Sequence, residues 1–105
     1  MKFSEYQQFA MSYARRGLLQ EAGHALGLAG EAGEVVDYLK KVIFHGHKLD
    51  VDKLTEELGD VLWYIAAIAS VYDIELEQVA SENLSKLWHR YPNGFDPKRS
   101  QERAE

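Results

Sequence analysis

The order of apolar and polar residues along the chain predicts four helices and no strand. The expected helices cover residues 4–16, 19–44, 52–72 and 75–91. Ser4 can cap the first helix, and Asp50 or Asp52 can cap the third. The breaks fall at Gly17, His45-Gly46-His47 and Pro92-Asn93-Gly94. The fold class expected from this order of elements is all-α.

The helix expected over 52–72 is apolar nearly all round beyond Asp60. Its residues Leu62, Trp63, Tyr64 and Ile65 cover the full helical turn. Such a helix is buried on every side, whereas a single four-helix bundle of 105 residues leaves one face of each helix wet. We therefore expect a homo-oligomer, a dimer or a pair of dimers, with this helix central to the interface.

The helix expected over 19–44 carries a stripe of glycines. These residues are Gly23, Gly27, Gly30 and Gly33. Each glycine inside a helix costs about 1 kcal/mol relative to alanine. The stripe predicts that another backbone or a ligand approaches closely. The alternative is that residues 17–27 form a loop.

Length and composition restrict the class of protein. A chain of 105 residues fits one domain with a small core, and we expect a helical domain over 1–95 and a polar tail over 96–105. The absence of cysteine excludes disulfides and thiolate metal sites. The N-terminus lacks the apolar run of a signal peptide, and no apolar segment reaches the ~20 residues that span a membrane. We expect a cytoplasmic protein without membrane partners. A net charge of -5 argues against a general nucleic-acid binder.

Two acidic pairs lie on different expected helices. They are Glu31 with Glu34, and Glu57 with Asp60. Residues three apart share a helix face, with Cβ atoms roughly 5–6 Å apart, so each pair points two carboxylates the same way. One such pair alone is usually a solvated face. Asp60, however, borders an apolar run, and carboxylates are rarely buried unless they are paired or bind a metal. Four carboxylates facing each other across two helices would repel, and a hard cation such as Mg²⁺ would offset that repulsion.

Three segments resemble the motifs of the MazG-like nucleotide pyrophosphohydrolases. They are residues 27–41 (GLAGEAGEVVDYLKK), 56–64 (EELGDVLWY) and 83–92 (NLSKLWHRYP). Each motif alone is moderately specific, and the three in this order and spacing are highly specific. The resemblance extends from about Gly27 to Pro92 and is weaker before Gly27.

The resemblance implies a four-helix-bundle-like, all-α NTP pyrophosphatase fold. It also implies Mg²⁺-dependent cleavage of a (d)NTP to the (d)NMP and pyrophosphate. By position, four residues match the metal ligands of the family, namely Glu31, Glu34, Glu57 and Asp60. Many members carry a further glutamate where this chain has Gly30. This departure puts an extra metal or base role at position 30 in doubt and leaves the four carboxylates intact.

The acidic residues suggest a chemistry for this reaction. Phosphoryl transfer depends mostly on positioning and charge stabilisation. Mg²⁺, with Mn²⁺ as the alternative, can polarise the phosphate and lower the pKa of a water molecule. A carboxylate beside that water can take its proton. Any of the four acidic residues could act as this base, and we favour Glu34.

The helix expected over 75–91 carries groups suited to a triphosphate. Asn83, Lys86 and Arg90 lie at spacings of three and four and form one stripe. Beside it runs the apolar stripe that we expect to face the core, made of Ala80, Leu84, Leu87 and Tyr91. Arginine suits bidentate phosphate contacts and lysine supplies a point charge. The alternative is that these polar residues form a solvated helix face.

Other residues have two interpretations each. Lys41 either contacts a phosphate from the face of Glu34 or pairs with Asp37 at i,i+4. Four aromatic residues could stack on a nucleobase, although aromatic residues at helical spacing more often belong to the core. They are Trp63, Tyr64, Trp88 and Tyr91. The segment His45-Gly46-His47 either binds a metal or phosphate or only ends a helix.

Three other functions compete with this one. A di-iron carboxylate bundle needs Glu-x-x-His from two helices, and the chain offers that spacing only at Glu21 and His24. An all-carboxylate site also suits Mg²⁺ better than iron. A non-catalytic helical oligomerisation module would explain the apolar third helix but not its acidic pair. A phosphoribosyl-ATP pyrophosphatase would share the acidic pairs, so only a direct comparison of substrates distinguishes that activity from (d)NTP cleavage.

Overall fold

The computed structural model describes the backbone of residues 1–14 and 18–103, and the side chains of residues 1–14 and 23–103. Within these ranges the chain is helical and contains no strand. The elements in chain order are α1 (Phe3–Ala10), the 3₁₀ helix η1 (Met11–Tyr13), α2 (Leu18–Phe44), α3 (Val51–Val71), α4 (Leu76–Arg90) and α5 (Pro97–Glu102). The all-α fold class expected from the sequence is confirmed.

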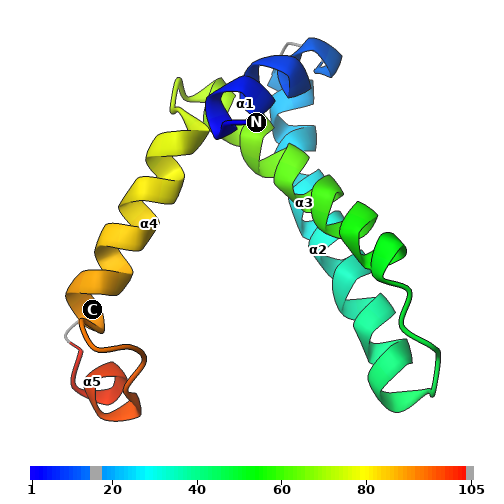
Figure 1. Ribbon diagram of the computed structural model, residues 1–105. Coiled ribbons are helices and arrows are strands. Elements are labelled where there is room, and N and C mark those ends of the chain that lie inside the picture. Colours follow the sequence, from blue (N-terminus) through cyan, green and yellow to red (C-terminus); the bar gives the residue numbers. More distant parts are fainter. Residues whose placement is uncertain (15–17, 104–105) are drawn as a thin grey trace.

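The helices form two arms that diverge from a vertex (Figure 1). The antiparallel pair α2 and α3 makes one arm, and α4 with α5 makes the other. Helix α1 lies across the vertex, where α3 turns into α4. The long helices of one chain therefore lie on two separate arms.

Local sequence signals set the turn between α2 and α3. Helix α2 ends at Phe44, and Gly46 adopts φ 71°, a left-handed conformation that favours glycine. The carboxylate of Asp50 then caps α3 by accepting hydrogen bonds from the amides of Asp52 (3.0 Å) and Lys53 (3.3 Å). The buried hydroxyl of Tyr38 accepts a further bond of 2.7 Å from the amide of Asp50. The stop at residues 45–47 and the cap at Asp50 are both confirmed.

The side chain of Gln7 cross-links the vertex. Its Nε2 donates to Ser70 Oγ and to the carbonyl of Ile74, both at 2.9 Å. Its Oε1 accepts a bond of 2.7 Å from the amide of Leu76, the first residue of α4. One residue of α1 thus holds the end of α3, the turn and the start of α4. These bonds fix the direction in which α4 leaves α3.

The first helix ends earlier than expected. It stops at Ala10, η1 follows, and Ala14 is extended, so the end at Arg16 was wrong. Residues 15–17 lie outside the described part of the chain. The cause is a competition for carbonyl groups. Ser12 Oγ donates to the carbonyl of Phe9 at 2.6 Å, and the indole of Trp63 donates to that of Ala10 at 3.1 Å.

The polar tail contains a helix that we did not predict. Asp96 caps α5 by accepting from the amide of Lys98 at 3.0 Å, and Pro97 occupies the first turn, where its missing N–H costs nothing. Arg99 Nε donates to the carbonyl of Arg90 at 2.6 Å. The segment therefore folds back onto the end of α4.

The apolar surface is only partly covered within one chain. Helix α3 buries Ala66, Ala67 and Ala69, while the larger residues 61–65 are half-buried, so this helix is not enclosed on every side. On α4, Leu76 is buried, but Leu84 and Leu87 are 67% and 44% exposed. Away from the vertex, the apolar stripe of α4 that we expected to face the core is therefore exposed to solvent.

The glycine stripe has one close approach. A β-carbon at Gly27 would overlap the ring of Tyr64, whereas Gly23, Gly30 and Gly33 have open space beside them. The expected approach is thus confirmed at Gly27 alone among these four. Because α2 begins at Leu18, the loop alternative was wrong for residues 18–27. Every helix in the described ranges is too short or too polar to cross a membrane.

Candidate metal centre

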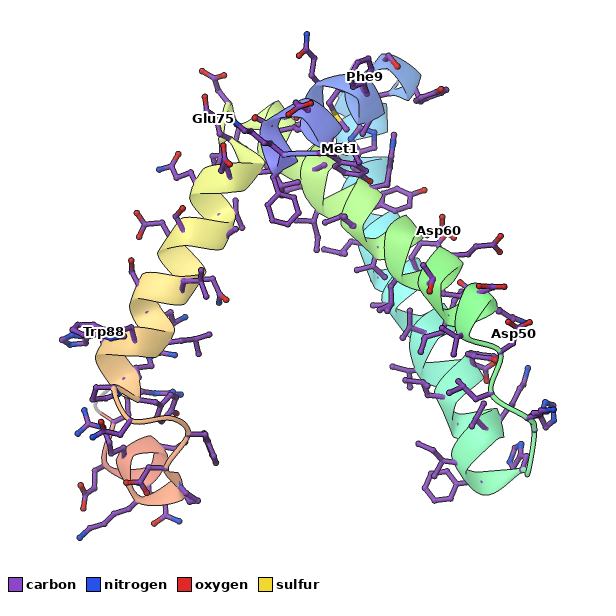
Figure 2. All side chains as sticks on the ribbon, in the orientation of Figure 1. Met1, Phe9, Asp50, Asp60, Glu75 and Trp88 are labelled. Atoms are coloured by element: carbon purple, nitrogen blue, oxygen red, sulfur yellow. The ribbon has the colours of Figure 1, made fainter. Side chains whose placement is uncertain are left out.

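Three of the four predicted carboxylates converge on the α2–α3 arm. Glu31 comes from α2, and Glu57 and Asp60 come from successive turns of α3. One carboxylate oxygen from each lies within 4.8 Å of the others. Glu31 and Glu57 are half-buried and Asp60 is exposed, so the group opens to solvent. Figure 2 shows Asp60 near the middle of this arm.

Like charges dominate the electrostatics of this group. The pKa of Glu31 is raised above its ordinary value of 4.5, first by partial burial and then by the negative charges of Asp60, Glu57 and Glu34. A carboxylate with a raised pKa prefers a proton or another cation beside it. The three oxygens therefore form a place where positive charge is stabilised.

Glu34 lies beside the group rather than within it. It is exposed and follows Glu31 by one helical turn. Its charge contributes to the raised pKa of Glu31, but its oxygens are outside the set that lies within 4.8 Å. The structure thus brings three predicted ligands together and leaves the fourth adjacent and accessible.

The donor set fits a hard divalent cation. All three converging atoms are carboxylate oxygens, which suit Mg²⁺ or Mn²⁺. No histidine of the described side chains joins them. His24 is buried against the rings of Trp63 (5.7 Å between centroids) and Tyr64 (6.4 Å), and its Nδ1 has no hydrogen-bond partner among the described residues. Glu21 lies outside the described side chains. The di-iron alternative therefore gains no support from the described residues.

The predicted phosphate-binding stripe lies on the other arm. Asn83 and Lys86 are exposed on α4, and Arg90 is half-buried at its end. Figure 1 separates α4 from the α2–α3 arm that carries the carboxylates. One chain therefore does not bring this stripe to its own acidic group.

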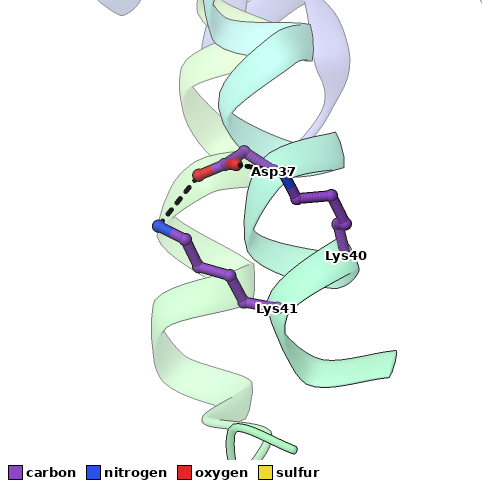
Figure 3. A network of polar contacts seen from close by, with 3 residues as sticks. All are labelled: Asp37, Lys40 and Lys41. Atoms are coloured by element: carbon purple, nitrogen blue, oxygen red, sulfur yellow. Dashed lines mark ion pairs between the residues drawn. The ribbon is translucent and has the colours of Figure 1, made fainter. Parts of the chain in front are cut away.

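Lys41 pairs with Asp37 on α2 (Figure 3). Its Nζ lies 3.0 Å from one carboxylate oxygen of Asp37, and Lys40 Nζ lies 3.4 Å from the other. Hydrogen bonds from Lys41 and then Lys40 lower the pKa of Asp37. The ion pair that we gave as the alternative role of Lys41 is present, and the phosphate role stays a prediction.

The aromatic candidates differ in their surroundings. The indole of Trp63 donates a hydrogen bond to the carbonyl of Ala10. Tyr64 packs edge-on against Trp63, with ring centroids 5.1 Å apart, as core residues do. Trp88 is 72% exposed. The hydroxyl of Tyr91 accepts a bond of 3.1 Å from Arg103.

The histidines after α2 occupy the turn. The amides of His45 and His47 donate to the carbonyl of Lys41 at 3.0 and 3.1 Å, which satisfies the end of the helix. This geometry confirms their role as a helix terminus.

Tyr6 is a neighbour of the acidic group that sequence reasoning missed. It is half-buried on α1, and its pKa is raised by burial and then by the charge of Asp60. No motif marks this residue. Only the packing of α1 against α3 brings it near Asp60.

A separate cavity of about 390 Å³ opens at the vertex. Its lining includes Gln7, Ser70, Asp73 and Glu75. None of the predicted site residues lines it. The candidate site is therefore the acidic group on the open surface of the α2–α3 arm.

Comparison with known proteins identifies the family. The MazG nucleotide pyrophosphohydrolase domain matches residues 20–95, which include the acidic group and all three motifs. Gene 37 protein of Mycobacterium phage L5 is 40% identical over 73 residues, which make up 66% of this chain and 64% of that protein. The chain thus spans less than two thirds of the length of that relative. No solved structure matches the chain. The chain belongs to the MazG nucleotide pyrophosphohydrolase family.

Proposed function

We propose that this protein is a Mg²⁺-dependent nucleoside triphosphate pyrophosphohydrolase that cleaves a (d)NTP to the (d)NMP and pyrophosphate. The observation that carries the proposal is the convergence of Glu31, Glu57 and Asp60 inside the family-matched region. An oligomerisation module would need no such group, because gathering three carboxylates destabilises a fold unless a cation binds there.

The three converging carboxylates would hold the cation. Bound there, a divalent cation supplies Lewis acidity and offsets the charge of the phosphates. The residues fix its position from two helices that pack directly against each other, so the distance between the ligands is set by the fold. Mn²⁺ has similar ligand preferences and is the alternative ion.

Glu34 is the residue to which we assign the general base. It is exposed, it stands one turn from Glu31, and it is not among the three converging ligands. Its carboxylate can therefore accept a proton from an attacking water. The water oxygen adds to one of the two phosphorus atoms of the α–β anhydride, and the bridging oxygen departs with the other. Pyrophosphate leaves in a single step.

The remaining phosphate charge needs cations from the protein. Lys86 and Arg90, with the amide of Asn83, have the chemistry for this role. Because they lie on the other arm, a second copy of the chain in a homo-oligomer would supply them. Lys41 is already engaged by Asp37, so it ranks behind them. Tyr91 lies next to Arg90 and is a candidate to contact the sugar or base.

The test is a product analysis with Mg²⁺ over the common and several modified NTPs and phosphoribosyl-ATP. We expect pyrophosphate as the first product, detected by a phosphate assay that responds only after inorganic pyrophosphatase is added. Orthophosphate released without that enzyme would contradict the proposed cleavage site. Turnover of phosphoribosyl-ATP alone would identify the related biosynthetic activity instead.

Two matched variants test the residues. Glu57→Gln should abolish most turnover because it removes a ligand charge while keeping the shape of the side chain. Glu56→Gln is the control, since Glu56 is the neighbouring exposed glutamate outside the group. Full activity of Glu57→Gln, or of the native protein in excess chelator, would refute the metal mechanism.

A further inference from the structure

The end of α4 packs little against the other long helices of its chain. Leu76 at the start of the helix is buried, but Leu84, Leu87 and Trp88 are 67%, 44% and 72% exposed. The last residue of α4 is Arg90, one of the two cations that we assign to the phosphates. The last carbonyls of a helix have no intrahelical donor, so a helix end without packing frays. A long side chain on that turn needs another anchor to keep a fixed position.

Helix α5 provides such an anchor where it folds back beside the end of α4 (Figure 1). Arg99 Nε donates a bond of 2.6 Å to the carbonyl of Arg90. This carbonyl is one of those that a helix leaves without an intrahelical donor, and a positive side chain there also interacts favourably with the helix dipole. The bond therefore holds the backbone of the residue that carries the predicted phosphate-binding guanidinium.

Tyr91, the residue after Arg90, is held at its hydroxyl, its carbonyl and its ring. The hydroxyl accepts a bond of 3.1 Å from Arg103 Nη1, and the carbonyl accepts one of 3.0 Å from the amide of Gly94. Gly94 adopts φ 91°, a left-handed conformation that favours glycine. The ring of Phe95 then lies 5.2 Å from that of Tyr91, between centroids. These contacts fix the chain directly after Arg90.

Helix α5 adds little to the core of the chain. Within the described part of the chain, none of its residues is buried, and it begins from its own cap at Asp96. An element that buries little apolar surface contributes little to the global free energy of unfolding. The side-chain bonds of this segment go to Arg90 and Tyr91 instead. Their main effect is therefore on the local order of the end of α4.

We propose that Arg99 is a positioning residue that holds Arg90 ready to contact the phosphates of the nucleotide, and that Arg103 supports it through Tyr91. This inference rests on the proposed function, in which Arg90 contacts a phosphate. A bidentate contact forms only when the planar guanidinium faces the phosphate oxygens, so the direction of Arg90 matters as well as its charge. Ordering this side chain before the substrate binds lowers the entropy cost of the contact. Arg99 and Arg103 act through their neighbours and do not touch the substrate.

A double-mutant cycle tests the proposal through activity. Arg99→Ala should lower kcat/KM by about 10-fold, because a misplaced group contacts the transition state less well. Arg99→Lys should recover most of this loss, since its ammonium can also donate to the carbonyl of Arg90. In an Arg90→Ala background, Arg99→Ala should change kcat/KM by less than about 2-fold, because the residue that it positions is already missing. Gln101→Ala, at an exposed neighbour on α5, is the control and should match the native protein.

Three results would overturn the proposal. Native activity of Arg99→Ala would refute the positioning role while turnover by the native protein upholds the proposed function. An equal loss in both backgrounds would mean that Arg99 contacts the substrate directly. A loss of activity that follows a lower Tm, without recovery in Arg99→Lys, would make Arg99 structural.

Hydrogen exchange tests the anchor without any turnover. In Arg99→Ala the amides of residues 87–91 should exchange faster than in the native protein, whereas the amides of the α2–α3 arm should keep their native rates. Unchanged exchange at the end of α4 would refute the support by α5. This result is independent of whether the protein is an enzyme, so it separates a failure of this inference from a failure of the proposed function.

Discussion

The ring of Tyr64 on α3 lies so close to Gly27 on α2 that a β-carbon at position 27 would overlap it. Among the described residues, this contact belongs to the most extensive interface between two helices, and these two helices carry the acidic group. Glycine at this position therefore sets the separation of α2 and α3, and with it the distance from Glu31 to Asp60.

The first prediction follows from that contact. Gly27→Ala should destabilise the protein by about 1–3 kcal/mol because the ring must move or the helices must separate. Gly23→Ala is the matched control, since nothing lies within 4 Å of its added carbon. The control should stabilise the protein by about 0.5–1 kcal/mol through helix propensity. Urea unfolding measures both, and equal shifts of the same sign would contradict the interpretation.

The sequence could predict the α2–α3 arm because its signals are local. The stop near Gly46, the cap at Asp50 and the i,i+3 spacing of the acidic pairs each involve residues within one turn or one loop. The short helix α5 was also within reach, since Asp96-Pro97 is a helix start signal that we did not use.

Long-range contacts determine the features of the fold that the sequence did not predict. The direction of α4 depends on Gln7, which meets residues more than 60 positions away. The early end of α1 depends on Trp63, and the position of Tyr6 beside Asp60 depends on how α1 packs. None of these contacts produces a periodic pattern of residues in the sequence. The divergence of the two arms at the vertex therefore could not be predicted from the sequence.

A second prediction concerns that vertex. Gln7→Ala removes three hydrogen bonds and leaves the amide of Leu76 without its acceptor, so it should cost about 1–3 kcal/mol. Gln8→Ala, on the neighbouring exposed residue, is the control and should stay within about 0.5 kcal/mol of the native protein. Chemical denaturation compares the two. Indistinguishable midpoints would mean that Gln7 does not hold the arms.

A third prediction concerns pH. Because the pKa of Glu31 is raised on folding above 4.5, the native state binds this proton more tightly than the unfolded state does. Its ionisation therefore destabilises the metal-free fold as pH rises through the window that begins near 4.5. In chelator, the Tm of Glu31→Gln relative to the native protein should increase from pH 4 to pH 7. A difference that is constant or decreases over this range would contradict the prediction.

Adding Mg²⁺ should reverse that ranking at pH 7. A cation that binds the folded state stabilises it by mass action, and the native protein keeps all three converging carboxylates. Glu31→Gln lacks one of them and should gain less. Thermal unfolding over a Mg²⁺ series measures the gain for each protein. An equal rise in Tm for both would place the ion elsewhere.

The last prediction assigns the phosphates to α4. Lys86 is exposed, so Lys86→Ala should leave the Tm almost unchanged. It should nevertheless lower kcat/KM by ~10-fold or more, since a charge-assisted hydrogen bond contributes ~1.5–3 kcal/mol. Lys48→Ala, at another exposed lysine on the α2–α3 loop, should change neither quantity. Loss of stability in step with activity would make Lys86 structural. Unchanged activity and stability would mean that other cations hold the phosphates, with Arg90 and the α5 residues Lys98 and Arg99 the next to replace.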